Sequence, residues 1–408
     1  MTQKAAYIAT VYSHLAAFHL PFMADLRQEG LEVHAYAASD HCREEVVAAG
    51  FDCRDLPFSR HPLAPGNWRA LEQLIRWLRE ERYEFVHVHT PNAAVIVRLA
   101  VWLAQLARPA GGQRIRLVYT AHGFHFYHGA PWRNWLFYLL ERSLARLTDV
   151  LITINREDEQ RARSFPVRGH VAYISGVGVE MERYTSPDAD EVGRYRKELG
   201  LAPEDFVILC TAELNGNKNQ GQLLSAVRGL RRSGVPAVLL LAGAGRNEAS
   251  LRKQAAEYGL TREVRLLGFR RDIPRLLQAA DVVALLSRRE GLPKALLEGM
   301  AAGKPLVTTD VRGSRDLVAP GRNGYLVPLG DVTATVAALI RLHQDPPQRR
   351  RMGEYSRKLA ALYDLSEIRR DVAAIYAGLL GPSHSRDALI QDVNHQGEEE
   401  QYDQVISQ

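Results

Sequence analysis

The sequence has few of the features that mark secreted, disulfide-linked or membrane-spanning proteins. Its 408 residues include three cysteines, Cys42, Cys53 and Cys210, whose spacing fits neither a disulfide framework nor a zinc motif. The most apolar stretch, residues 99–107, is flanked by arginines and is too short to cross a bilayer. The first residues lack the basic and apolar regions of a signal peptide. We therefore expect a protein of a reducing, cytoplasmic compartment.

A strong charge of either sign is also missing. Lysine and arginine number 52 and aspartate and glutamate 47, which leaves a net charge of +5. This balance fits anionic partners such as nucleotide phosphates, an anionic membrane surface or nucleic acid, and it equally fits a solvated basic surface. Hydrophobic residues make up 46% of the chain, as in ordinary globular domains, and the length favours two or three domains.

Short apolar runs alternate with helical patterns along the chain, which is typical of βαβ units in a parallel sheet. The first series of runs covers residues 7–10, 33–37, 85–89, 117–120 and 150–154. After a charged and polar connection, the second series covers residues 207–211, 237–241, 264–267, 282–286, 306–309 and 325–327. We predict an α/β protein with two Rossmann-like, doubly wound domains that face each other across a cleft.

The domain boundaries follow from the same pattern. Residues 1–180 form the first predicted domain and residues 181–362 the second. An amphipathic helix is predicted at the end, within residues 363–380, and we expect it to pack back toward the first domain. The remaining residues, 381–408, contain few large apolar side chains, so a mobile tail is expected there.

The most informative segment is SRREGLPKALLEGMAAGKPLV, residues 287–307. Glu290 follows a predicted strand at its carboxyl end, where open α/β sheets bind ligands. Pro293 stands where a helix can begin, and the free N–H groups near Gly291 and Leu292 suit an anionic or hydroxyl-rich ligand. Glu298 lies about one turn into that helix, where its carboxylate can accept hydrogen bonds from a ribose diol.

Glu290, seven intervening residues and Glu298 resemble the E-x7-E motif of glycosyltransferase family 4. The similarity extends through residues 266–318 and 321–331 and over essentially the whole chain to residue 380. The run TAHGFHFYHGAPWRNWLFYLLERSLARLTDVLITIN, residues 120–155, looks most similar to bacterial capsule and exopolysaccharide transferases of that family. The resemblance implies the GT-B fold and transfer with retention of anomeric configuration.

In the second domain, the resemblance implies a donor site. Lys218 matches a family lysine that holds the leaving diphosphate, and Asn217 stands beside it, whereas Glu213 occupies the position of the usual arginine. Arg288 or Arg289 could supply the second positive charge. The loop with Phe269 and Arg270 is expected to meet the nucleotide base. The full set of donor-binding residues is Glu213, Asn217, Gly243, Phe269, Arg270, Gly291, Leu292, Pro293 and Glu298. Gly243 is expected mainly to allow a tight turn.

In the first domain, His122 follows a predicted strand at its carboxyl end, and the resemblance assigns it a contact with the donor sugar near the reacting centre. Together with Glu290 and Lys218 it makes the predicted catalytic set. His89 and Thr90 end another strand, and Ser13 and His14 follow the first strand. These four residues are expected on the acceptor side. Many relatives have a glycine pair where this chain has Ser13 and His14, so a phosphate contact there is less well supported.

An apolar series with helical spacing follows the first-domain motif: Trp132, Trp135, Leu136, Leu139, Leu140 and Leu147. We interpret it mainly as a stripe that faces the core. The alternative is an aromatic and basic surface, with Arg133, Arg142 and Arg146, that rests on the inner face of the cell membrane.

The resemblance implies transfer of a hexose or N-acetylhexosamine from a UDP-sugar, with GDP as the rival nucleotide, to a lipid-linked sugar acceptor. No metal and no further cofactor are expected, because Asp188 and Asp190 have metal-motif spacing but lie in the predicted connection. Nucleic acid is not an expected partner. A sugar-nucleotide 2-epimerase, an NAD-dependent oxidoreductase and an inactive sugar-nucleotide-binding protein are the alternatives. The incomplete glycine fingerprint after residue 241 argues against the oxidoreductase.

Overall fold

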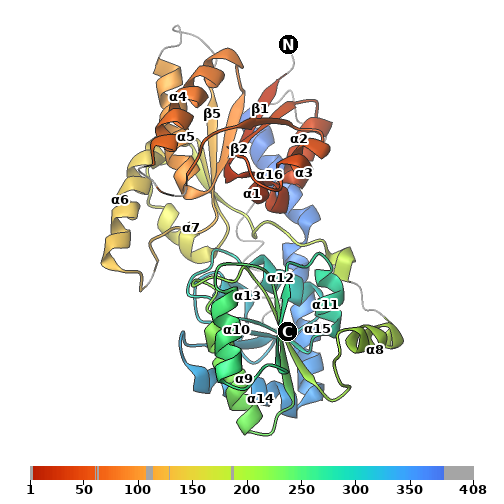
Figure 1. Cartoon of the computed structure of the whole chain (residues 1–408). Helices are drawn as coiled ribbons and strands as arrows, with labels where there is room; N and C mark the ends of the chain where they lie inside the picture. Colours follow the sequence, from red (N-terminus) through yellow and green to blue (C-terminus); the bar gives the residue numbers. More distant parts are fainter. Residues whose placement is uncertain are drawn as a thin grey trace. The chain divides into compact units, whose positions relative to one another are not determined.

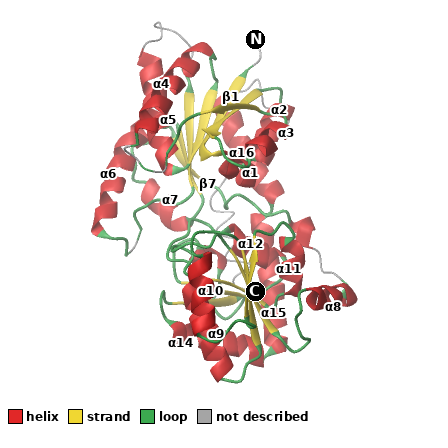
Figure 2. Ribbon diagram, in the orientation of Figure 1, coloured by secondary structure: helices red, strands yellow, loops and turns green. Residues whose placement is uncertain are grey.

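The computed structural model describes residues 3–59, 61, 64–106, 114–127, 129–184 and 188–380. They form two units. The first comprises the described residues up to Val177 together with residues 368–380, and the second is Gly178–Glu367. Each unit contains a parallel β-sheet with helices on both faces (Figure 1 and Figure 2). The predicted mobile tail, residues 381–408, lies outside the described residues.

The first unit is built on a seven-stranded sheet with strand order β3-β2-β1-β4-β5-β6-β7. The strands are β1 (Lys4–Val11), β2 (Glu32–Ala38), β3 (Asp52–Asp55), β4 (Phe85–His89), β5 (Arg116–Ala121), β6 (Val150–Thr153) and β7 (His170–Tyr173). The helices are α1 (Tyr12–Phe18), α2 (Leu20–Gln28), α3 (Arg43–Ala48), α4 (Pro65–Glu80), α5 (Pro91–Leu106), α6 (Trp135–Leu144), α7 (Arg156–Ala162) and most of α16 (Leu365–Leu380).

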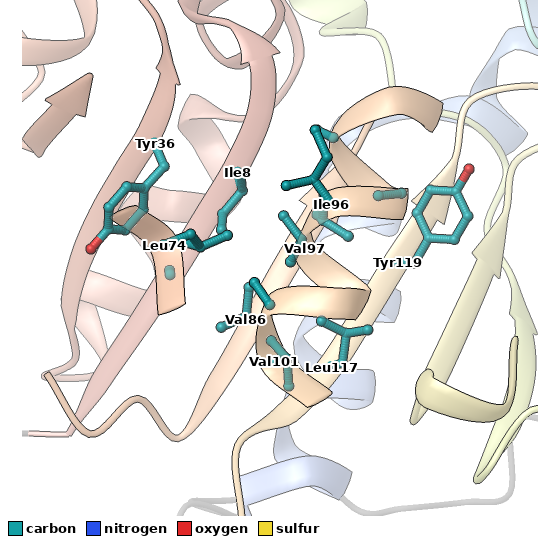
Figure 3. Close-up of a cluster of buried hydrophobic side chains, with 14 of the residues drawn as sticks. Ile8, Tyr36, Leu74, Val86, Ile96, Val97, Val101, Leu117 and Tyr119 are labelled. Carbon is teal, nitrogen blue, oxygen red and sulfur yellow. The ribbon is translucent and has the colours of Figure 1, made fainter. Parts of the chain in front are cut away.

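Both faces of this sheet are buried, as expected for parallel strands joined by helical crossovers. Ile8, Val86 and Leu117 lie on one face and pack with Leu74 of α4 and Val97 of α5 in the main apolar core (Figure 3). Alternation along the strands sends their neighbours to the other face. The first unit therefore needs a second layer of helices to cover its sheet.

The last helix, α16, contributes to that second layer. The Tyr376 ring stacks on Phe85 of β4 with centroids 4.9 Å apart, and its hydroxyl lies 2.6 Å from Nδ1 of His87. An ion pair between Arg369 and Asp25 ties the same helix to α2. Residues at the end of the chain thus complete the domain that begins it.

The second unit has a six-stranded sheet with order β10-β9-β8-β11-β12-β13. Its strands are β8 (Phe206–Thr211), β9 (Ala237–Ala242), β10 (Val264–Gly268), β11 (Val282–Leu285), β12 (Leu306–Thr309) and β13 (Gly324–Val327). The helices are α8 (Ala189–Glu198), α9 (Gln220–Arg232), α10 (Glu248–Glu257), α11 (Ile273–Ala279), α12 (Lys294–Ala301), α13 (Ser314–Leu317), α14 (Val332–Gln344) and α15 (Pro346–Ala360). The two predicted doubly wound α/β domains are confirmed.

The sequence pattern did not reveal β3 and β7. Both are edge strands, and their sequences, DCRD and HVAY, lack the continuous apolar run of a central strand. In the predicted connection, the exposed Asp188 accepts a hydrogen bond from the Asp190 N–H and caps α8. No described helix is long and apolar enough to span a bilayer.

The interpretation of the α6 region as mainly a core stripe was wrong. Trp132 is 79% and Leu136 70% exposed, and Trp135, Phe137, Leu139 and Leu140 are exposed as well. The buried residues of α6 are Glu141 and Leu144. An acidic residue, rather than the apolar stripe, faces the interior because it has a buried partner there.

That partner is Arg98 of α5. Its guanidinium is 1% exposed, donates from Nη2 to Oε2 of Glu141 at 2.7 Å and from Nε to the carbonyl of Ala94, and lies 4.6 Å from the centroid of the Tyr119 ring. Burial, and then the charge of Glu141, raise the pKa of Tyr119 well above its ordinary value. Two charges removed from water have to satisfy each other, so this pair fixes α6 on α5.

We expect Arg98→Ala to lower the free energy of unfolding by about 3–5 kcal/mol, because Glu141 would remain as an uncompensated buried charge. Urea unfolding measures the effect. The double variant Arg98→Met/Glu141→Leu fills the same space without charge and should recover most of the loss. A single variant as stable as the unmodified protein would contradict the assigned role of the pair.

Candidate functional site

Each sheet has one point at which the strand order reverses. In the first unit β1 lies between β2 and β4, and in the second β8 lies between β9 and β11. Successive crossovers leave such a point in opposite directions, which opens a crevice at the carboxyl ends of the two strands, where α/β proteins bind ligands. The loops after β1, β4, β8 and β11 carry most of the predicted site residues.

The loop after β8 is held in place by its own amides. Oδ1 of Asn215 accepts the N–H groups of Asn217 at 3.0 Å and of Lys218 at 3.1 Å. Asn219 takes a left-handed conformation with φ of 51° and donates from Nδ2 to the carbonyl of Leu286. Asparagine tolerates this conformation better than most residues. Lys218 thus projects from a fixed turn rather than from a loose polar loop.

Lys218 and Glu290 meet although 72 residues separate them. Nζ of the lysine lies 2.6 Å from Oε1 of the glutamate, and both side chains are mostly buried. Two further contacts join the same loops: Asn217 donates to the carbonyl of Arg289, and Arg312 donates to the carbonyl of Glu290. A cation and a carboxylate therefore stand together at the β8/β11 crevice.

The segment after Glu290 approaches its neighbours closely. Gly313 has φ of 70°, and a Cβ there would collide with the carbonyl oxygen of Gly291. Leu292 is buried, and α12 begins directly after Pro293; no side chain among the described residues caps this helix. The positive end of the α12 dipole therefore lies directly after the Glu290 loop, where it favours an anionic ligand.

Glu298 lies in the second turn of α12 and faces Tyr184. Burial raises the pKa of the Glu298 carboxyl, while Lys294, the Tyr184 hydroxyl and Arg183 oppose that shift. Burial also raises the pKa of Tyr184, followed by the charge of Glu298. The two glutamates of the motif thus have different partners, a lysine for Glu290 and a phenol for Glu298.

The remaining predicted donor-site residues are more dispersed. Glu213 is exposed, and a Cβ on Gly243 would collide with the carbonyl oxygen of Ala212, so that turn needs glycine. Phe269 is 72% exposed at the end of β10. Arg270 is held by two contacts with the Asp272 carboxylate and a 3.1 Å bond to the Tyr195 hydroxyl. In this loop the Phe269 ring is therefore accessible to a ligand, whereas the Arg270 guanidinium is engaged by protein groups.

In the first unit, five histidines gather near the carboxyl ends of β4 and β5: His14, His19, His87, His89 and His122. The His19 and His89 rings stack with centroids 3.6 Å apart, and the His14 and His122 rings meet edge to face at 4.7 Å. Nε2 of His122 lies 3.4 Å from Nδ1 of His89. His87 is anchored by the Tyr376 and Thr120 hydroxyls.

Burial keeps four of these imidazoles from accepting a proton. It lowers the pKa of His14 to about 4 and that of His87 to about 3. The pKa values of His89 and His122 are lowered well below the ordinary value by burial, and then by the neighbouring histidines. These rings are therefore neutral at pH 7 and act as polar groups rather than as cations.

Thr90 has φ of 73°, a strained conformation for a β-branched residue. The Thr90 hydroxyl lies 2.7 Å from the Thr10 hydroxyl and also accepts a hydrogen bond from the Thr10 N–H. These bonds join the end of β1 to the end of β4. Ser13 is fixed by its N–H bond to the Asp40 carboxylate. Strain held by hydrogen bonds at a sheet switch point is typical of a functional position.

Thr90 and His14 also line a cavity of about 530 Å³ within the first unit. Val95 and Ile96 of α5 and Phe137 and Leu140 of α6 form its apolar walls. Hydroxyl, amide and imidazole groups and the Glu141 carboxylate supply the polar part. Lysine and arginine are not among the described lining residues, which are Thr10, Val11, His14, Asn67, Thr90, Pro91, Asn92, Val95, Ile96, His125, Phe137, Leu140 and Glu141. This lining suits an uncharged, partly apolar ligand better than a phosphate.

Sequence reasoning did not identify several residues of these sites. His19 stands between α1 and α2 in a segment without any motif, and Tyr184 lies in the predicted connection. Arg312 and Asp40 act through the backbone of Glu290 and Ser13. Each is brought in by the fold rather than by a local pattern, so the sequence carried no signal for it.

Comparison with known proteins is consistent along the chain. Residues 192–359 match the family "Glycosyl transferases group 1", and residues 20–176 match the "Glycosyl transferase 4-like domain". EpsD of Bacillus subtilis (strain 168), which is named as a glycosyltransferase, is 38% identical over 383 residues, or 93% of this chain and 98% of EpsD.

Two further similarities have more descriptive names. The Escherichia coli UDP-Gal:alpha-D-GlcNAc-diphosphoundecaprenol alpha-1,3-galactosyltransferase is 29% identical over 282 residues, 68% of this chain and 70% of that protein. The crystal structure of Anabaena Alr3699/HepE in complex with UDP and glucose matches with a TM-score of 0.77 at 19% identity, over 92% of this chain and 100% of that one.

The buried imidazoles predict a pH dependence of stability. The pKa of His87 is about 3 in the folded chain, against about 6.5 when unfolded, so the unfolded state binds one more proton between these values. Stability should therefore fall as the pH is lowered from 6.5 toward 3. His87→Gln should reduce the slope by about 1.4 kcal/mol per pH unit.

Urea unfolding between pH 4.5 and 6.5 measures the slope of the free energy of unfolding against pH. The free energy of unfolding from pH 7 to 8 gives the reference value for each protein. A slope identical in the variant and the unmodified chain would show that His87 is already protonated in the folded state.

Proposed function

This chain belongs to the glycosyl transferases group 1 family, with a glycosyl transferase 4-like first domain, and is a glycosyltransferase of the GT-B fold; we propose that it acts with retention of configuration on a UDP-sugar. The sugar moved would be a hexose or N-acetylhexosamine, and the acceptor a lipid-linked sugar in exopolysaccharide or capsule synthesis. The observation that carries the proposal is the Lys218–Glu290 pair at the β8/β11 crevice, with Glu298 in the second turn of the helix that follows.

The donor would be held by four features of the second unit. Lys218 and the positive end of the α12 dipole supply favourable charge for the diphosphate. Glu298 accepts hydrogen bonds from the ribose hydroxyls, and the exposed Phe269 ring offers a face for the base. The Escherichia coli relative is named for a UDP-sugar and the Anabaena structure contains UDP, and these two similarities support uridine as the base.

In the transfer itself, the bond between the anomeric carbon and the diphosphate oxygen breaks as the acceptor oxygen bonds to the same face of that carbon. The acceptor proton passes to the leaving diphosphate. Negative charge grows on the diphosphate, so Lys218 stabilises the transition state more than the ground state. Glu290 orients Lys218 and a sugar hydroxyl, and the neutral His122 contacts the donor sugar. The proposal includes no metal and no other cofactor in this step.

Glu213 in the usual arginine position calls for a second cation from elsewhere. Arg288 is exposed in the loop after β11 and donates from Nε to the carbonyl of Gly216, two residues before Lys218. Its N–H donates to the carbonyl of Asn217 as well. We assign the second diphosphate contact to Arg288 on the strength of these bonds.

The acceptor assignment rests on the first unit. The 530 Å³ cavity is bordered by the predicted acceptor residues His14 and Thr90 and by apolar walls, a suitable lining for a neutral sugar. The exposed apolar side chains of the α6 region lie next to Arg133, Arg142 and Arg146, which are also exposed. An aromatic and aliphatic face with arginines beside it suits peripheral contact with an anionic membrane, where a lipid-linked acceptor resides. The Escherichia coli relative is named for an undecaprenol-linked acceptor.

We expect UDP and UDP-sugars to stabilise the protein in the presence of EDTA, by about 2.7 kcal/mol at a hundredfold excess over the dissociation constant. Glu298→Ala should abolish this stabilisation because the ribose loses its acceptor. Thermal unfolding with UDP, UDP-glucose, UDP-N-acetylglucosamine and GDP makes the comparison.

The matched control is Glu257→Ala, which removes an exposed glutamate from the end of α10 and should keep the full response to UDP. Lys218→Met should still fold but transfer labelled sugar to lipid-linked acceptor at least about tenfold more slowly. A response to GDP alone would overturn the choice of nucleotide, and transfer unaffected by Lys218→Met would overturn the assigned role of the lysine.

The exposed apolar surface of α6 predicts that the protein binds lipid vesicles. The unmodified protein should co-float with vesicles of phosphatidylglycerol and phosphatidylethanolamine. Leu136→Glu should bind at least about tenfold more weakly, because it loses the transfer free energy of a leucine.

Trp68 provides the control, since it is 63% exposed but lies on α4. Trp68→Glu should float like the unmodified chain. Equal losses from both variants, or no flotation of any of the three proteins, would contradict the assignment of α6.

A further inference from the structure

We propose that His14, His19 and His122 form a binding site for a divalent transition metal, with Zn²⁺ as its natural probe. One ring nitrogen from each lies within 4.8 Å of those of the other two. The three residues come from α1, the junction of α1 and α2, and the end of β5, all in the first unit. The proposal goes beyond the transferase function, in which His122 alone of these three residues has an assigned contact with the donor sugar.

The chemistry of the donor set selects the metal. Three imidazoles without a thiolate or carboxylate suit zinc, copper or nickel rather than magnesium or calcium. Zinc–nitrogen bonds of about 2.0–2.1 Å in a tetrahedron place ligand nitrogens about 3.4 Å apart. The 4.8 Å limit on the separations in this cluster exceeds that spacing by about 1.4 Å, so the three rings have to move closer together around an ion.

Polar atoms left without protein partners point to the same ligand. Nε2 of His14 and Nε2 of His89 are buried and have no hydrogen-bond partner among the described residues. Leaving such a group unsatisfied costs about 1–3 kcal/mol. A cation in the cluster would take up the lone pair of His14 directly.

The surrounding contacts form a supporting shell. Nδ1 of His89 lies 3.4 Å from Nε2 of His122, and the His89 ring stacks on His19. His87 packs on His89 at 4.1 Å and is locked by the hydroxyls of Tyr376 and Thr120. Such outer contacts fix ring orientation and raise metal affinity. The cluster is thus held from behind by the sheet and by α16.

An ion can reach the cluster from one side. His14 lines the 530 Å³ cavity together with Thr10 and Thr90, so a path leads from that cavity to the imidazoles. Three protein ligands leave the fourth tetrahedral position to water, as in open metal sites. The geometry therefore describes a site that exchanges its metal rather than a closed structural site.

The consequence for activity follows from His122. A metal that occupies its nitrogen withdraws the imidazole from the donor sugar contact assigned above, so we expect micromolar Zn²⁺ to inhibit transfer reversibly. This consequence rests on the proposed function. Metal binding itself does not, and it is measured without any sugar nucleotide.

The test titrates the full-length chain with Zn²⁺ in competition with a chromophoric chelator. One equivalent should bind, and His19→Ala and His14→Gln should each weaken binding by more than about tenfold, since even outer-shell losses cost 10–100-fold. His41→Ala is the matched control, because Asp40, His41 and Cys42 are the other described group with ligand atoms at metal-binding distances. Co²⁺ absorption should indicate nitrogen ligands in the unmodified chain and in His41→Ala.

Far-ultraviolet circular dichroism and thermal unfolding without ligand show whether each variant is folded. No competition with the chelator, or equal binding in the unmodified chain and both histidine variants, would overturn the site. Binding lost in His41→Ala and retained in His19→Ala would move the metal to the other group and equally overturn it. Zinc binding without inhibition of transfer would support the metal site. It would contradict the assigned contact between His122 and the donor sugar.

Discussion

The constraint on which both units depend is the reversal of strand order beside β1 and beside β8. Crossovers between parallel strands are right-handed, so helices that leave in opposite directions cover opposite faces of the sheet. The carboxyl ends of the two strands at the reversal remain uncovered. In the first unit this position carries Thr90 and His14, and in the second it carries Lys218 and Glu290. The strand order alone thus determines where the candidate sites lie, whatever side chains occupy those positions.

Electrostatics then differentiates residues that look alike in the sequence. Glu290 is neutralised by Lys218 at 2.6 Å, whereas Glu298 is half-buried in α12 against a phenol, with a raised pKa. Glu290 holds the Lys218 ammonium in a mostly buried position, so the lysine is partly desolvated and oriented before any ligand binds. Preorganisation of this kind avoids reorganisation of solvent at the reacting centre.

Much of the fold could be read from the sequence because buried parallel strands are continuous apolar runs, as in β4, β9 and β11. The edge strands β3 and β7 lack that signal. The E-x7-E motif singled out Glu290 and Glu298, because a strand end and a helix start locate them, and the resemblance to the family singled out Lys218. Helical spacing misled at α6, because periodicity shows that a face is apolar but not what covers it, and the buried Arg98–Glu141 pair reversed its orientation. His19 and Tyr184 could not be found, because only folding brings them near their partners.

The membership of α16 in the first unit bears on how the protein is made. Tyr376 covers Phe85 and His87, so one face of the first sheet lacks its last layer until residues 368–380 have left the ribosome. The whole second unit is synthesised in between, which takes roughly 10–40 s at 5–20 residues per second. During that interval the nascent first unit exposes apolar and imidazole surface and is at its most vulnerable to aggregation and to chaperone capture. Truncation from the carboxyl end should therefore damage the amino-terminal domain first.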